Sequence, residues 1–330
     1  MFDLAIIGAG PIGLEAAIRA KRAGLRYVVL EQGCVVNAIA AYPTYMTFFT
    51  TSERLEVGKH PLVTTTDKPT RKEALDYYRK VVHNEELDVR QYTTVTGLTR
   101  TPDGFELAAQ TDKGEAQTFR AQKVAVATGY FDNPKFLGIP GEDRANVSHY
   151  YSESHPFYNR NVTIVGAGSS AADAALDLFK GGAKVTMIHR GEGFRHSLKY
   201  WIRPNLENRV KEGAIVAHFD TIITEVTPDA VVVDKNGERL VIPTDQTFLL
   251  TGYYASADLL AQVGVEVDAA DGSAQHSEET FETNIPGLYV IGSAGYGTRT
   301  SDVFIENGIV HANKALDDIV AKLARKPVTV

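Results

Sequence analysis

Residues 2–31 read FDLAIIGAGPIGLEAAIRAKRAGLRYVVLE and decide the fold of this chain. An apolar run leads into a glycine-rich turn, a helical pattern and a second apolar run. Gly8 permits the tight turn, Gly10 lets a pyrophosphate approach the backbone, and Gly13 lets the helix pack against the strand. Glu31 follows Gly8 by 23 residues, where an acid can accept hydrogen bonds from an adenosine ribose. The stretch therefore predicts a strand–helix–strand unit that binds a dinucleotide.

A second copy of this plan begins at Asn161, with an apolar strand, the glycine turn GAGSSA at residues 166–171, a helix and a second strand. Each copy is followed by a β-hairpin and by a strand that ends in Thr-Gly, at residues 128–129 and 251–252. Repetition of a whole supersecondary unit is informative about architecture. Two such units predict two dinucleotide sites, which a dehydrogenase with a single cofactor would not need.

The fold class that follows is α/β, with two Rossmann-like dinucleotide-binding domains. The 330 residues suffice for two domains at about 150 residues each. A short strand within 287–292 has no glycine turn of its own, and a helix follows from about Asp302. We expect this strand to complete the first sheet, so that the first domain takes residues 1–132 and 252–330 and the second, residues 133–251, is inserted in it.

Composition excludes several classes of function. The net charge of −7, with no Lys/Arg run, argues against a general nucleic-acid binder. No apolar stretch approaches the roughly 20 residues of a membrane span, and the N-terminal apolar run is too short for a secretory signal. We expect a cytoplasmic protein without nucleic-acid or membrane partners. Its one cysteine, Cys34, excludes an intramolecular disulfide, a C-x-x-C pair and a cysteine zinc site, and we expect no metal.

The two copies differ at the position that selects the ligand. His189 follows Gly166 by 23 residues, as Glu31 follows the first turn, and Arg190 and Arg195 come after it. A carboxylate suits a ribose 2′-hydroxyl and repels a 2′-phosphate, whereas cations do the reverse. The first copy is therefore predicted to bind FAD, and the second to bind NADPH in preference to NADH.

Candidate catalytic side chains are scarce, and none is assigned because a flavin itself carries the electron chemistry. The helix after Asp302 could direct its partial positive charge at the N1–C2=O edge of the flavin, although the Asp302 carboxylate would offset that field. His155, before a proline, is interpreted as a turn histidine rather than a proton donor. Cys34 lies on the adenosine side if Glu31 contacts the ribose, and is interpreted as inert.

The two-copy layout resembles the thioredoxin-reductase-like flavoproteins over the whole chain. Within that group it is similar to the YpdA-type bacillithiol-disulfide reductases, on strings at residues 42–44, 47–49, 127–130, 155–156, 199–205 and 304–308 (YPT, TFF, ATGY, HP, KYWIRPN and FIENG). The resemblance implies FAD, a preference for NADPH, a cytoplasmic homo-oligomer (dimer or tetramer) and a role in low-molecular-weight thiol redox balance.

The motifs of the family also imply site residues. The implied FAD contacts are Gly8, Gly10, Pro11, Ile12, Gly13, Glu31, Gln32, Thr47, Phe48, Val95, Thr128, Gly129, Gly292 and Ile305. The implied NADPH contacts are Gly168, Ser169, Ser170, His189, Arg190 and Arg195. Ile12 departs from the pattern, because many members carry a cysteine there and isoleucine cannot form a mixed disulfide. Either the flavin reduces its acceptor without a protein thiol, or the acceptor differs.

The leading hypothesis is an NADPH-dependent FAD oxidoreductase of the bacillithiol-disulfide-reductase type, whose acceptor is a small-molecule disulfide or a small redox protein. A ferredoxin- or flavodoxin-NADP reductase uses the same architecture and needs no cysteine. A flavin-dependent monooxygenase shares the twin glycine turns. A redox sensor that binds NADPH and FAD with little turnover is the alternative from outside the enzymes.

Overall fold

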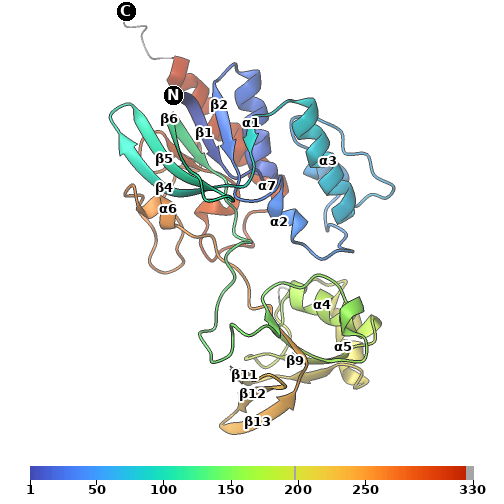
Figure 1. Ribbon diagram of the computed structural model, residues 1–330. Coiled ribbons are helices and arrows are strands. Elements are labelled where there is room, and N and C mark those ends of the chain that lie inside the picture. The colour runs from blue at the N-terminus through green and yellow to red at the C-terminus, as the bar shows by residue number, and fades with distance from the viewer. Residues whose placement is uncertain (197, 325–330) are drawn as a thin grey trace, which may run out of the picture. The chain divides into compact units, whose positions relative to one another are not determined.

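The computed structural model describes residues 1–196 and 198–324 (Figure 1). Its contacts divide the chain into two compact units. The first unit comprises Met1–Ala40, Met46–Asn133 and the chain from Tyr253 onward, and the second comprises Ala41–Tyr45 and Pro134–Gly252. The short segment Ala41–Tyr45, expected in the first domain, thus groups with the second unit, where the Thr44 amide donates to the Ser152 carbonyl at 2.8 Å.

The first unit is built on a sheet of seven strands in the order β3-β2-β1-β6-β5-β4, with β15 also paired to β6. The pairs β1–β2, β2–β3, β1–β6 and β6–β15 are parallel, whereas β4, β5 and β6 form an antiparallel meander. The carboxyl ends of the central parallel strands meet at one edge, where this class of sheet binds ligands. The strands are β1 (Phe2–Ile7), β2 (Tyr27–Leu30), β3 (Val89–Arg90), β4 (Thr93–Thr101), β5 (Gly104–Thr111), β6 (Ala116–Val126) and β15 (Leu288–Val290). The pairing of β15 with β6 confirms that the late strand completes the first sheet.

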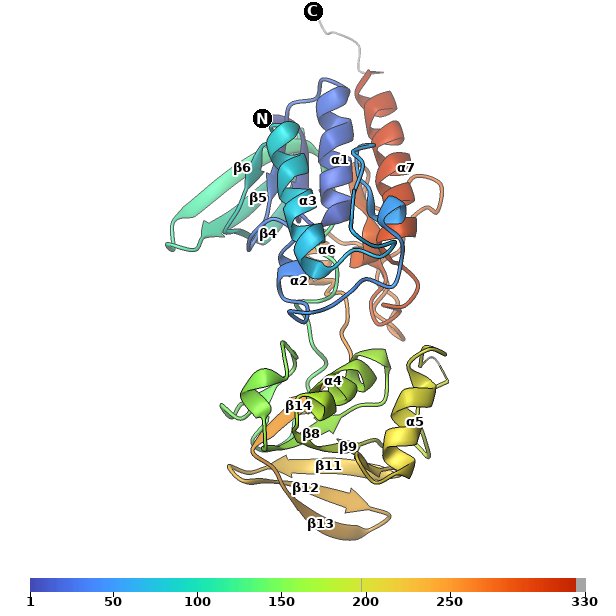
Figure 2. The ribbon, with the colours of Figure 1, turned by 90° about the vertical axis from the view of Figure 1, so that its right-hand side faces the viewer.

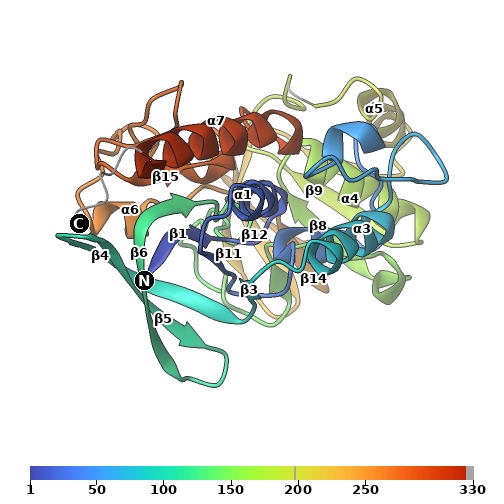
Figure 3. The same cartoon turned by 90° about the horizontal axis from the view of Figure 1, so that it is seen from above.

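The helices of the first unit are α1 (Pro11–Arg22), α2 (Asn37–Ala40), α3 (Arg71–Asn84), α6 (Asp258–Ala261) and α7 (Ile305–Ala324), with 3-10 turns η1 (Ser52–Leu55) and η3 (Gly292–Gly295). Helix α1 lies between α3 and α7, and the view from above shows α7 running beside α1 (Figures 2 and 3). No helix in the described part of the chain is long and apolar enough to span a bilayer.

Helix α7 begins at Ile305, three residues later than the expected start near Asp302. The Asn307 side chain explains the boundary, because its Oδ1 accepts from the Phe304 amide at 2.7 Å and its Nδ2 donates to the Asp302 carbonyl at 2.8 Å. A side chain in the first turn that binds back to the preceding amide caps a helix N-terminus. Asp302 therefore lies outside the helix, three residues before its first residue, and the acid in the first turn is Glu306.

The second unit has three layers. Its five-stranded parallel sheet follows the order β10-β9-β8-β14-β7 and lies between α4 and α5 on one face and the antiparallel sheet β11-β12-β13 on the other (Figure 2). Apolar clusters fill both gaps, around Ile164, Leu178 and Leu206 on the helix side and around Val165, Ile223 and Val231 on the sheet side. Its strands are β7 (Val147–Ser148), β8 (Asn161–Val165), β9 (Lys184–Ile188), β10 (Val216–His218), β11 (Thr221–Val226), β12 (Ala230–Lys235), β13 (Glu238–Pro243) and β14 (Gln246–Leu249); its helices are α4 (Ser169–Lys180) and α5 (Arg203–Lys211), with a 3-10 turn η2 (His155–Phe157).

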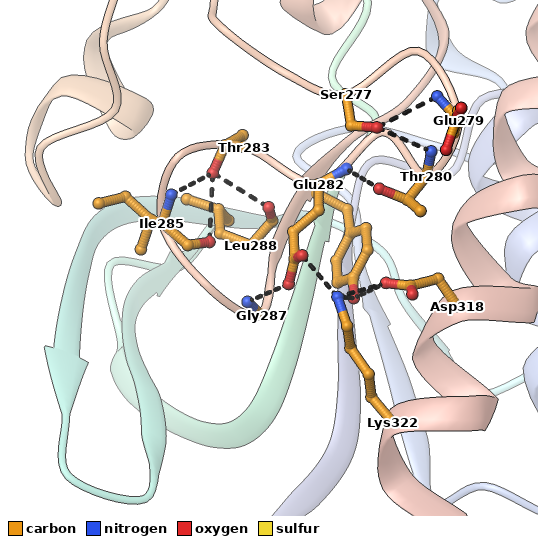
Figure 4. A network of polar contacts seen from close by, with 11 residues as sticks. Ser277, Glu279, Thr280, Glu282, Thr283, Ile285, Gly287, Leu288, Asp318 and Lys322 are labelled. Carbon is orange, nitrogen blue, oxygen red and sulfur yellow. Dashed lines mark hydrogen bonds and ion pairs between the residues drawn. The ribbon is translucent and has the colours of Figure 1, made fainter.

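A polar network fixes the C-terminal half of α7 to the segment around β15 (Figure 4). The Lys322 ammonium lies 2.5 Å from a Glu282 carboxylate oxygen and 2.6 Å from one of Asp318. The fully buried Tyr289 donates from its hydroxyl to Asp318 at 2.6 Å. Burial would raise the pKa of Asp318, but hydrogen bonds from Lys322 and Tyr289 outweigh it and lower that pKa. The network thus holds the strand that leads into the Gly292 turn.

Replacing Lys322 by methionine should destabilise the first unit by about 2 kcal/mol at neutral pH, between the values typical of exposed and of buried ion pairs. The variant leaves two carboxylates without their cation. Because the pKa of Asp318 is depressed in the fold, the stabilisation is present above its unfolded value and lost as pH falls through its folded value. Urea unfolding at several pH values measures the difference, with Lys80→Met on the exposed face of α3 as the control. An equal loss at acid and neutral pH would contradict this origin.

Candidate functional sites

The glycine turn of the first unit owes two of its glycines to backbone contacts. Gly8 has φ +108°, and a Cβ on it would lie 2.5 Å from the Ala127 carbonyl oxygen. A Cβ on Gly13 would lie 2.0 Å from the Gly8 carbonyl oxygen. Real Cβ atoms do not approach backbone so closely, so α1 can pack onto β1 only with glycine at these two positions.

Gly10 has a different role, because a Cβ placed on it meets nothing within 4 Å. It is the N-cap of α1, it supplies no side chain to bind the first amide groups, and the first turn carries no acid. The free N–H groups and the positive end of the helix dipole therefore face open space. This combination suits a phosphate group.

The second unit repeats this arrangement at α4. Gly166 has φ +140° and a Cβ on it would lie 2.4 Å from the Leu250 carbonyl oxygen, whereas a Cβ on Gly168 meets nothing within 4 Å. Gly168 is the N-cap of α4, and neither Ser169 nor Ser170 caps the helix through its side chain. The third glycine of the turn is replaced by Ala171, which is buried in the core of the unit. The second turn thus offers a phosphate group the same arrangement as the first.

Glu31 at the end of β2 is 6% exposed and binds the glycine turn directly. Its carboxylate accepts from the Ala9 amide at 2.6 Å and from the Gly33 amide at 2.8 Å. Burial raises the pKa of the Glu31 carboxyl, and these two amide donors oppose the rise. The next residue, Gln32, donates to Asp132 at 2.8 Å. The acid lies beside the turn, where the ribose of a dinucleotide would lie.

Cations replace the acid at the corresponding edge of the second unit. His189 follows β9, and its amide donates to the His218 carbonyl at 2.9 Å. Burial, and then the nearby charges of Arg195 and Arg190, hold the pKa of His189 below its usual value. Neither arginine forms an ion pair with any other described residue of the chain, and both are exposed. The edge therefore presents two exposed guanidinium groups, and the nearby carboxylate of Asp220 only partly opposes their effect on the pKa of His189.

Other predicted residues of the first unit lie close to its glycine turn. Gly129 has φ +71°, and a Cβ on it would lie 4.0 Å from the Ser293 hydroxyl. A Cβ on Gly292 would lie 3.2 Å from the Ile12 side chain, and one on Gly308 would lie 2.8 Å from it. Ile12 therefore packs between the Gly292 turn and the first turn of α7. This arrangement brings Thr128, Gly129, Gly292 and the Ile305 end of α7 to the carboxyl edge of the sheet.

Three further residues predicted to contact a ligand, Thr47, Phe48 and Val95, make contacts elsewhere in the first unit. Thr47 pairs with Thr70 in an isolated β-bridge, and the Phe48 amide donates to the Pro69 carbonyl at 2.9 Å. The Val95 side chain is in the hydrophobic core, although β4 begins beside Glu31, to whose carbonyl the Thr93 amide donates at 2.8 Å. Their roles as ligand contacts stay predictions.

The two reactive side chains, Cys34 and His155, lie in local turns. Cys34 is partly buried, with its Sγ 3.6 Å from the Asn37 side-chain oxygen. His155 is exposed on the 3-10 turn η2. One further histidine, which the sequence did not single out, lies beside the Gly292 turn: His311 on α7 is 8% exposed and stacks on Phe281 with the ring centres 4.0 Å apart. Burial, and then the charge of His276, lower the pKa of His311 to about 4, so the ring is neutral.

Comparison with known proteins agrees with this geometry. The family model described as pyridine nucleotide-disulphide oxidoreductase matches residues 5–292. The chain belongs to this family. Membership makes it a flavoprotein oxidoreductase that uses a flavin and a pyridine nucleotide, as the sequence analysis predicts in outline.

Similarity to individual proteins shows which members of the family this chain resembles. The chain is 39% identical to bacilliredoxin reductase Bdr of Bacillus subtilis, over 97% of each chain. The bacillithiol disulfide reductase Bdr (YpdA) of Bacillus cereus superposes with a TM-score of 0.95 at 37% identity, over 97% of this chain and 99% of that one. These matches confirm the resemblance to the bacillithiol-disulfide reductases. Thioredoxin reductase of T. acidophilum, at 21% identity and TM-score 0.76 over 98% of this chain and 99% of that one, shares the fold.

Proposed function

We propose that this chain is an NADPH-dependent FAD oxidoreductase that reduces the disulfide of a low-molecular-weight thiol of the bacillithiol type. One observation carries the cofactor assignment. At each of two uncapped helix N-termini a Cβ on the N-cap glycine would meet nothing within 4 Å, and the neighbouring strand end bears a buried carboxylate in the first unit and exposed arginines in the second. A carboxylate suits the free ribose of FAD, and cations suit the 2′-phosphate of NADPH.

In this assignment the two units form two separate sites. FAD binds a domain of residues 1–132 and 252–330, built around the first unit, with its diphosphate at Gly10, Pro11 and the N-terminus of α1, and its ribose at Glu31. NADPH binds a domain of residues 133–251, built around the second unit, with its diphosphate at Gly168, Ser169 and Ser170 and its 2′-phosphate at His189, Arg190 and Arg195. When bound, the flavin supplies hydride-transfer chemistry, while the protein binds and orients both cofactors.

The proposed acceptor has to be reduced without a protein thiol in the glycine turn. Ile12 stands in the glycine turn where many members of the resembled family carry a cysteine, and the thiol of Cys34, the single cysteine of the chain, lies 3.6 Å from the Asn37 side-chain oxygen. The enzyme therefore contributes no sulfur to the reaction, and the acceptor takes its electrons from the flavin. The reaction consumes NADPH, one proton and one disulfide, and it gives NADP⁺ and two thiols, so atoms and electrons balance.

An anaerobic assay tests the acceptor. The FAD-loaded protein is offered NADPH with bacillithiol disulfide, with ferredoxin or flavodoxin, and with oxygen in a separate aerated sample. We expect bacillithiol disulfide to be the best acceptor, with two thiols formed for each NADPH oxidised. Faster reduction of ferredoxin or flavodoxin would favour the NADP-reductase alternative. A long-lived absorbing species with oxygen would favour a monooxygenase, and bleaching of the flavin without turnover on any acceptor would favour a redox sensor.

The proposed 2′-phosphate site also predicts a pH dependence. The pKa of His189 is below its usual value in the free protein, and a bound phosphate dianion would raise it. Binding then takes up a proton, so the affinity for 2′,5′-ADP should fall as pH rises through the pKa of His189 in the complex. Calorimetry compares wild type with the His189→Asn variant. The phosphate of the ligand titrates equally with both proteins, so a difference between their pH profiles reports on His189. Identical pH profiles for the two proteins would rule out proton uptake at His189.

A further inference from the structure

The chain between β9 and α5 carries Arg195, and its backbone there is fixed on both sides. On the N-terminal side, Phe194 packs edge-on against Phe219 with ring centres 5.1 Å apart. On the C-terminal side, the Arg195 carbonyl oxygen accepts from the Leu198 amide at 2.9 Å. Leu198 itself is 3% exposed in the helix-side core. These contacts anchor the chain at Phe194 and at Leu198, and the Arg195 carbonyl oxygen lies between the two anchors.

A second donor reaches the same carbonyl oxygen from α5. The Arg203 guanidinium donates from Nη2 to the Arg195 carbonyl at 2.7 Å, and from Nη1 to the Glu207 carboxylate at 2.9 Å. Glu207 lies one helical turn further along α5, so it orients the guanidinium. Ile202 and Leu206, on either side of Arg203, are buried in the core of the second unit and fix the helix.

We propose that Arg203 is a positioning residue for coenzyme selectivity: it holds the backbone of Arg195 so that the Arg195 guanidinium stays beside His189 and Arg190, where the 2′-phosphate binds. The inference rests on the proposed NADPH site. It assigns a role to an arginine that touches no coenzyme atom itself, and it explains why one guanidinium divides its donors between a carboxylate and a loop carbonyl. Without this bond the Arg195 backbone keeps only the contacts at Phe194 and Leu198, so more of its freedom is lost when the coenzyme binds, at a cost in binding free energy.

Binding of nucleotide fragments to the FAD-loaded protein tests the role without turnover. Selectivity is the ratio of the Kd for 5′-ADP to the Kd for 2′,5′-ADP, measured by calorimetry. Arg203→Met, which keeps the aliphatic stem, should lower this ratio about 10-fold, the equivalent of one lost charge-assisted hydrogen bond. Lys211→Met removes a positive charge from the exposed end of the same helix and should leave the ratio unchanged. In steady-state assays, Arg203→Met should raise KM for NADPH with little change in kcat.

A double-mutant cycle separates positioning from long-range charge. In an Arg195→Ala background, Arg203→Met should cause no further loss of selectivity, because the group that it positions is gone. An undiminished second loss there, or unchanged selectivity in Arg203→Met alone, would overturn the inference. Arg203→Lys keeps the charge with one donor nitrogen, so it should show an intermediate loss and serves if the methionine variant fails to fold. A wild type that does not prefer 2′,5′-ADP would instead contradict the proposed NADPH site.

Discussion

The double variant Arg190→Ala, Arg195→Ala should lose about 100-fold in kcat/KM for NADPH, from two charge-assisted hydrogen bonds of about 1.5 kcal/mol each. Its kcat/KM for NADH should stay within a few-fold of wild type, because NADH has no 2′-phosphate for the arginines to bind. Both side chains are exposed and form no ion pair with a described residue, so their removal leaves no buried charge behind. The loss of selectivity should appear in KM rather than in kcat.

A second pair of arginines controls for net charge. Arg160 and Arg239 are exposed in the same unit, away from the proposed site in sequence and on other strands or turns. Replacing both by alanine removes as much positive charge from the unit as the test pair does. It should change kcat/KM for NADPH and kcat/KM for NADH alike and by little. If the control pair lowers NADPH selectivity as much as the test pair does, the effect is one of overall charge and the 2′-phosphate assignment is wrong.

Gly10→Ala should leave the chain folded and lower its affinity for FAD by about 100-fold, the equivalent of roughly 2.7 kcal/mol. Gly10 has φ −68° and ψ 172°, a conformation that alanine adopts, and its added Cβ would meet no protein atom within 4 Å. Glycine and alanine at an N-cap differ by under about 1 kcal/mol. The new methyl group would instead occupy the space that a diphosphate needs for a close approach to the backbone.

Two further glycine variants make this test specific. Gly168→Ala, the counterpart in the second unit, should weaken NADPH binding and leave FAD bound. Gly13→Ala should destabilise the fold itself, because its Cβ would lie 2.0 Å from the Gly8 carbonyl oxygen. Equilibrium FAD titration of the apoprotein and thermal melting separate the two effects. Normal FAD affinity in folded Gly10→Ala would contradict the assignment of the α1 cradle to the diphosphate.

The features that the sequence predicts well are those dictated by local backbone geometry. Strand β2, Tyr27–Leu30, coincides with the second apolar run of the opening stretch, because a short apolar run bounded by Gly24 and Glu31 leaves little freedom. Gly8 and Gly13 occupy positions where a side chain would meet backbone, which is why glycine spacing alone locates the turn. The place of β15 beside β6 was also predictable, because a strand without a glycine turn of its own does not start another dinucleotide-binding unit.

Other features leave weak or misleading traces in the sequence. Strand β11 was not predicted, because Ile222 is 58% exposed and obscures the alternation of buried and exposed residues. Helix α5 was also missed: only Leu206 of its nine residues is fully buried, so it shows no apolar periodicity. The bond from Arg203 to the Arg195 carbonyl joins a helix to a loop, and no residue pattern encodes such a contact. The same holds for the packing of His311 against the Gly292 turn.

The central claim is that one chain binds FAD in its first unit and accepts electrons from NADPH bound to its second. An anaerobic titration of the purified, FAD-loaded protein with NADPH, followed by its visible absorption, tests this most directly. We expect a yellow protein with one FAD per chain that is bleached by one equivalent of NADPH, and much more slowly by NADH. A colourless protein that takes up no FAD, or a flavin that NADPH and NADH bleach equally fast, would contradict it.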